Sequence, residues 1–99
     1  MRLYGRGSVI ARKTAAYQRL LDTAFDNSEP AGARQIIRLD VERVQTSCGW
    51  GVPVLDYKGE RPSLENWAKA KGEAGLELYR REKNAVSIDG FATGFAAEE

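Results

Sequence analysis

Residues 34–47, which have the sequence RQIIRLDVERVQTS, form the main predicted strand. Apolar residues at every second position from Ile37 to Val41 alternate with charged ones, and this period of two predicts a strand with one buried face. The alternation then slips, because continuing it would bring Arg43 rather than Val44 to the buried face. A slip of one residue is typical of a β-bulge. We therefore expect a long, half-buried strand with a bulge near its end.

Residues 2–12 predict a second strand of the same alternating kind. One of its faces carries two glycines among apolar residues: Leu3, Gly5, Gly7, Val9 and Ala11. Glycines in a strand often mark a place where another backbone or a ligand comes close. A tightly packed neighbouring helix is the alternative explanation. A third, short strand is predicted at residues 54–57, after Pro53.

Helices are predicted on either side of the main strand. Residues 14–26 have Thr14 as a plausible N-cap and a buried face that includes the aromatic residues Tyr17 and Phe25. Near the C-terminus, Ser63 is a plausible N-cap for a helix over residues 64–71.

Gly72 ends that helix, and a second helix follows over about residues 73–83. Asp89 and Gly90 then predict a turn, and residues 95–99 a frayed tail. The predicted class is α+β: about three antiparallel strands, an N-terminal helix and a C-terminal helical pair, in one domain over residues 1–94.

The composition excludes several classes of function. Of the 99 residues, 42% are hydrophobic and 29% are charged, which is unlike a disordered tail. The formal charge of +1 gives no electrostatic footprint for nucleic acid or a membrane surface, and no apolar run approaches the roughly 20 residues of a membrane helix. One cysteine and no histidine exclude an internal disulfide, His-ligated metals and His-based catalytic triads built from this chain alone. We expect a cytoplasmic protein without a metal.

The segment after the main strand is a candidate ligand site. Gln45, Thr46 and Ser47 place three hydrogen-bonding side chains in a row, and a glycine-flanked tryptophan, Trp50, follows. An amide and hydroxyls can bind a polar ligand, glycines permit close backbone approach, and an indole offers a flat face. The spacing of a phosphate-binding P-loop is absent. A polar strand end followed by an ordinary turn, with the tryptophan in the core, is the alternative.

The same segment resembles a known family. Residues 44–53, VQTSCGWGVP, are similar to the VQTSCGYGVP block of pyridoxamine 5′-phosphate oxidase-like flavoproteins, with Trp50 in place of the usual tyrosine. The segments around residues 3–7 and 32–37 resemble the family's RLYGRA and GARQI segments, in the same order. The resemblance extends from about residue 2 to residue 94 and corresponds to the C-terminal half of the family's domain.

The resemblance implies a split β-barrel that binds flavin mononucleotide (FMN) at the interface of a dimer, and an oxidoreductase activity. It places the following residues near the flavin: Gln45, Thr46, Ser47, Cys48, Gly49 and Trp50. For Cys48, a buried structural thiol is the alternative. No catalytic residue is implied.

Only the second half of the family's barrel is represented in this sequence. We therefore expect a partial barrel that binds flavin only with a second copy or with a separately encoded N-terminal half, and that is inactive alone. A non-catalytic interaction module or an inactive fragment is the alternative function.

Overall fold

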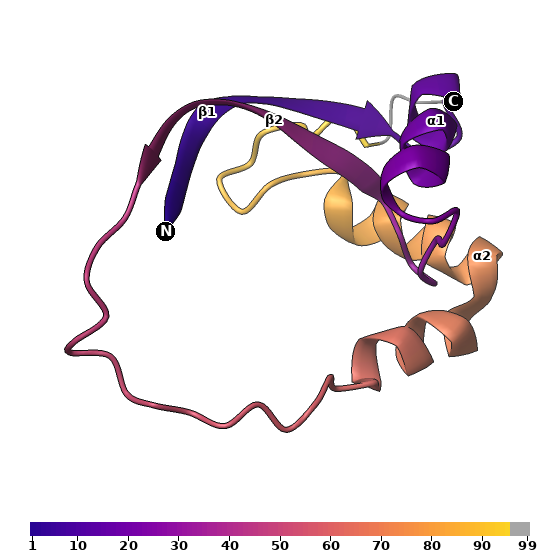
Figure 1. Ribbon diagram of the computed structural model, residues 1–99. Coiled ribbons are helices and arrows are strands. Elements are labelled where there is room, and N and C mark those ends of the chain that lie inside the picture. The colour runs from indigo at the N-terminus through magenta and orange to yellow at the C-terminus, as the bar shows by residue number, and fades with distance from the viewer. Residues whose placement is uncertain (96–99) are drawn as a thin grey trace. The chain divides into compact units, whose positions relative to one another are not determined.

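The structure, a computed structural model, describes residues 1–95 (Figure 1). In chain order its elements are β1 (Arg2–Ala11), α1 (Ala15–Ala24), β2 (Gln35–Gln45) and α2 (Ser63–Asn84). The chain divides into a sheet unit, Met1–Glu29 with Ala33–Glu60, and a helical unit, Pro30–Gly32 with the residues from Arg61 onward. The predicted α+β class is confirmed.

In the sheet unit, β1 and β2 lie side by side as an antiparallel pair (Figure 1). Tyr4 is opposite Arg43, but its neighbour Gly5 is opposite Val41. The register shift therefore leaves Glu42 as one extra residue of β2, which is the geometry of a β-bulge. The bulge predicted from the slip in the alternation is confirmed.

The bulge keeps the apolar residues of β2 on one face of the sheet. Without it, Val44 would lie on the face opposite to Val41, whereas with it Val44 is opposite Leu3. We call the resulting surface the apolar face; its large side chains are Leu3, Val9, Ile37, Leu39, Val41 and Val44. These side chains are between 39% and 67% exposed, so the expected burial of this face is wrong for the described residues.

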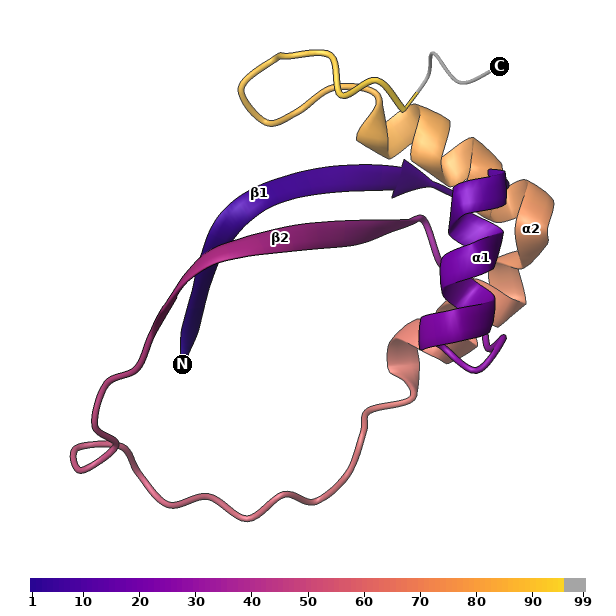
Figure 2. The same ribbon diagram turned by 45° about the horizontal axis from the view of Figure 1, so that its top comes forward.

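The third strand is not formed. Residues 54–57 have no strand assignment, and in both views the chain after Gln45 runs away from the sheet (Figure 2). A strand exists only where a neighbouring backbone completes its hydrogen bonds, and no such neighbour is paired with these residues. The described residues thus form an open, two-stranded sheet, and the split barrel is not part of the observed fold.

Helix α1 begins as predicted. The Thr14 side chain accepts a hydrogen bond from the backbone N–H of Tyr17 at 3.2 Å, which satisfies one of the free donors of the first turn. Tyr17 and Leu21 are buried, with 4% and 6% of their surfaces exposed. Phe25, expected in the core, is 48% exposed, because it lies at the C-cap where the helix has already ended.

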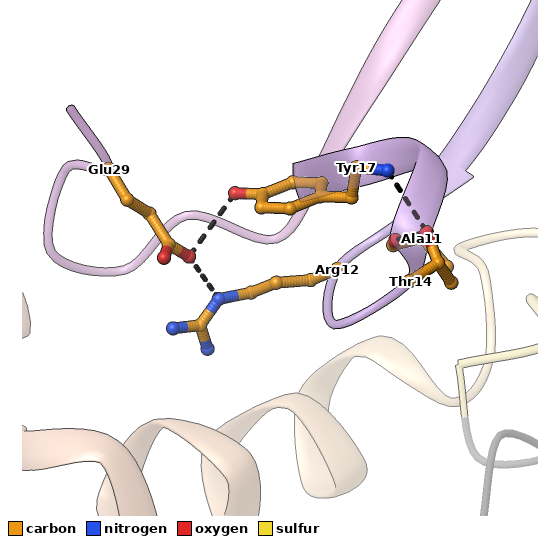
Figure 3. Close-up of polar contacts among 5 residues, drawn as sticks. All are labelled: Ala11, Arg12, Thr14, Tyr17 and Glu29. Carbon is orange, nitrogen blue, oxygen red and sulfur yellow. Dashed lines mark hydrogen bonds and ion pairs between the residues drawn. The ribbon is translucent and has the colours of Figure 1, made fainter. Parts of the chain in front are cut away.

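A polar cluster joins the two ends of this helical segment (Figure 3). Glu29 accepts a hydrogen bond from the Tyr17 hydroxyl at 3.2 Å and forms an ion pair with Arg12. The pKa of Tyr17 is raised, mainly by burial and then by the nearby negative charge of Glu29. The cluster fixes the segment after α1 against the turn that precedes the helix.

In the helical unit, α2 is interrupted at Gly72, whose φ of 68° and ψ of 171° are not helical. This confirms the predicted break between two helices. Trp67 and Tyr79, on either side of the break, form an edge-to-face pair with ring centroids 5.0 Å apart. Ser63 is not the N-cap: it is the first helical residue, and Pro62 occupies the cap position without a side-chain cap bond.

The turn predicted at the end of the chain is confirmed, with Gly90 at φ 85° and its N–H bonded to the Ser87 carbonyl. Residues 96–99, which include most of the predicted frayed tail, lie outside the described residues.

Candidate functional site

The six predicted site residues lie in sequence at one end of the sheet. Gln45 is the last residue of β2 and is paired with Arg2, and the residues after it leave the sheet. The backbone N–H of Val52 donates to the Gly49 carbonyl at 3.0 Å and closes a turn that presents Trp50. All six residues are exposed, and Trp50 is 97% exposed. The structure therefore arranges them as an open row rather than an enclosed pocket.

Gln45 is held in place by residues that the sequence did not single out as site residues. The Tyr4 hydroxyl donates a hydrogen bond to Gln45 Oε1 at 3.2 Å. The Arg43 guanidinium lies 4.4 Å from the centroid of the Tyr4 ring, which is the geometry of a cation–π contact. This hydrogen bond uses the amide oxygen of Gln45 and leaves its NH₂ group to donate to a ligand. The cation–π contact could have been found only from the register of the two strands, which places Tyr4 opposite Arg43.

The charge beside the row is positive. Arg2 and Arg43 flank Tyr4 and Gln45 at this end of the sheet. Further along the same strands, Arg6 pairs with Glu42 at 3.2 Å and Arg38 pairs with Asp40 at 3.1 Å. Those two arginines are balanced by their partners, so the positive charge is concentrated near Gln45, where it would favour an anionic ligand.

The exposed side chains of this row are suited to binding a ligand. Gln45, Thr46 and Ser47 supply an amide and two hydroxyls, and Trp50 supplies an exposed indole. Cys48 is an exposed free thiol, so a buried structural role is not observed. Within residues 1–95, no three carboxylate or thiol side chains are grouped so that they could hold a metal ion.

Across the same part of the chain, no helix is both long and apolar enough to cross a membrane. Nothing in the structure tests the expected cytoplasmic location, which stays a prediction.

Comparison with known proteins confirms the family resemblance. The chain is similar to a pyridoxamine 5′-phosphate oxidase family protein, ustO, of Aspergillus flavus, with 35% identity over 103 aligned residues. The alignment covers 91% of this chain and 41% of that relative, so the chain spans less than half of the relative's length. No family model matches the chain, and no solved structure matches it.

Proposed function

We propose that the chain is the flavin-binding C-terminal part of an oxidoreductase of the pyridoxamine 5′-phosphate oxidase family, with FMN as its cofactor. The observation that carries this proposal is the position of the VQTSCGWGVP block. It places an oriented Gln45 amide, two hydroxyls and an exposed indole in one row beside two arginines. The similarity to a family member over 91% of the chain supports the same assignment.

Each residue of the row has a distinct proposed role. Gln45 donates its free N–H groups, and Thr46 and Ser47 their hydroxyls, to polar atoms of the flavin ring or ribityl chain. Gly49 lets the backbone approach the ligand, and Trp50 covers one face of the ring. Cys48 lies between them in sequence as an exposed free thiol. A bound flavin would supply the hydride chemistry, while the protein binds and orients it.

Because the row is open, a second surface is needed to cover the flavin. A flavin resting on six exposed residues would keep much of its surface in water, whereas ligand sites normally bury most of the ligand. The covering surface would come from a second copy of the chain or from a separately encoded N-terminal half. We therefore propose that the chain alone is catalytically inactive even where it binds flavin.

The proposal is tested by FMN titration of a site variant. Replacing Gln45 and Ser47 together by alanine removes two hydrogen bonds of about 1 kcal/mol each, which corresponds to roughly thirtyfold weaker binding. The matched control is Gln18→Ala with Ser28→Ala, which changes the same residue types around α1 and should leave the affinity unchanged. Equal affinities for the two double variants would remove the row from the site.

A second candidate function is a non-catalytic interaction module. The exposed apolar face of the sheet favours it, because such surfaces commonly mark association sites. FMN binding distinguishes the two functions. A module that only associates with another protein would show no saturable FMN binding, even at concentrations at which it associates.

A further inference from the structure

Three side chains of α2 meet across the break at Gly72. The rings of Trp67 and Tyr79 have centroids 5.0 Å apart and planes at 77° to each other. The ammonium nitrogen of Lys71, Nζ, lies 5.4 Å from the Trp67 centroid and 5.5 Å from the Tyr79 centroid. The nitrogen and the two centroids therefore form a nearly equilateral triangle. We call the two rings, with the place beside them that the Lys71 ammonium occupies, the aromatic corner.

The break in the helix builds the aromatic corner. In an uninterrupted helix, Trp67 and Tyr79 would be about 18 Å apart along the axis, because each residue rises by about 1.5 Å. Gly72, with its non-helical φ of 68°, lets the two segments of α2 turn against each other, as Figure 1 shows. Each segment has one buried residue of its own: Ala68 in the first and Leu76 in the second. Both rings are thus carried by helical segments that the fold fixes.

The cation in the aromatic corner is held by the rings alone. The neighbouring Lys69 pairs with Glu65 at 2.7 Å, whereas Lys71 forms no ion pair with any residue from 1 to 95. Lys71 is exposed, and its ammonium ends a flexible stem of four carbons. A cation–π contact at an exposed site is weak, so this ammonium can move into water at little cost. The corner therefore holds a cation that another cation can replace.

We propose that the aromatic corner binds a small organic cation with a trimethylammonium group, and that this ligand displaces the Lys71 ammonium. A lysine ammonium is compact and strongly hydrated, which favours its return to water. A trimethylammonium group carries the same charge on apolar methyl groups, and aromatic ring faces recognise such groups. The rings are accessible, since Trp67 is 37% exposed and Tyr79 is half-buried. The proposal concerns the helical unit and does not rest on FMN binding.

The direct test is a choline titration of the flavin-free chain, followed by NMR of the indole N–H groups of its two tryptophans. A Trp50→Phe variant assigns the two signals. We expect a saturable shift of the Trp67 signal and a smaller shift of the Trp50 signal, because Trp50 is a single exposed ring. Equal shifts of both signals, or no shift of the Trp67 signal, would overturn the proposal.

An uncharged probe separates the charge of the ligand from its shape. In this analogue of choline a tert-butyl group replaces the trimethylammonium group. Because the ring faces attract the positive charge, the analogue should shift the Trp67 signal much less than choline does at the same concentration. Equal binding of the two probes would contradict recognition of a cation.

The variant Lys71→Ala tests the displacement. Without the internal competitor, choline should bind about two- to fivefold more tightly, which is the size of an exposed cation–π contact. Lys69→Ala is the matched control, because this lysine pairs with Glu65 and should not affect the affinity. Tyr79→Phe keeps the ring and should keep the binding. Unchanged or weaker choline binding by a folded Lys71→Ala variant would overturn the proposal, and so would loss of binding in Tyr79→Phe. Because no flavin is present, these outcomes leave the FMN proposal standing.

Discussion

Gly5 lies so close to Asp40 that a Cβ on the glycine would be 1.9 Å from the Asp40 carbonyl oxygen. The two residues meet at the register shift, where Glu42 is inserted into β2 and the strand bends. A backbone atom cannot rotate away as a side chain can. The bulge that keeps the apolar residues of β2 on one face therefore requires glycine at this position.

Replacing Gly5 by alanine should destabilise the sheet. The added methyl group must displace β2 at the bulge, and such overpacking costs typically 1–3 kcal/mol. Gly7→Ala is the matched control, because its Cβ would meet no atom within 4 Å. Urea unfolding followed by circular dichroism measures both. Equal free energies of unfolding for the two variants would show that the close approach is absent in solution.

Thr14→Ala should weaken the start of α1. The variant loses the hydrogen bond from the Tyr17 N–H, and lost N-caps cost about 0.5–2 kcal/mol. Thr23→Ala, in the body of the same helix, removes the same hydroxyl where alanine is the better helix former. The thermal midpoint should therefore fall for Thr14→Ala and hold or rise for Thr23→Ala. A fall of equal size in both would argue against the cap.

Gly72 and Gly75 should respond to alanine in opposite directions. Gly72 has a φ of 68° and a ψ of 171°, a conformation that is strained for any residue with a Cβ. Gly75 is helical, and its Cβ would make an ordinary contact of 3.5 Å with Lys71. We expect Gly75→Ala to stabilise the chain by about 0.5–1 kcal/mol and Gly72→Ala to destabilise it. Stabilisation by both substitutions would mean that α2 is continuous.

The stability of the chain should fall at high pH through Tyr17. Its pKa is raised above the ordinary value of 10.0, so its neutral form is favoured in the folded state. This contribution is fully present below about pH 10 and is lost as the pH rises through the raised pKa. Tyr17→Phe cannot titrate and should lose less stability over that range. The free energy of unfolding at a series of pH values compares the two, and parallel curves would exclude the effect.

Local features of the fold were predictable where the determining residues are close in sequence. The bulge followed from Val44 and the helix start from Thr14, and the break in α2 followed from Gly72. In each case one residue imposes a backbone geometry through a short-range effect. Ser63 was wrong as the N-cap because the helix begins at Ser63 itself, one residue earlier than expected, and Pro62 occupies the cap position without a side-chain cap bond.

Features that depend on distant partners were not predictable. Residues 54–57 have a strand-like pattern, but no backbone pairs with them, and the pattern cannot supply one. The burial of Ile37 was expected from its alternation, although alternation identifies a face and not what covers it. The order of residues in the candidate site was evident from the sequence. The support of Gln45 by Tyr4, however, joins positions that are 41 residues apart.

Trp50 itself can report whether the row of residues around it binds FMN. The chain has two tryptophans, so Trp67→Phe leaves Trp50 as the sole emitter and keeps an aromatic ring against Tyr79. The measurement is the Trp50 fluorescence of this variant during an FMN titration. Saturable quenching is expected, since the flavin would lie beside the indole. Emission that stays unquenched, in a sample shown by circular dichroism to be folded, would contradict it.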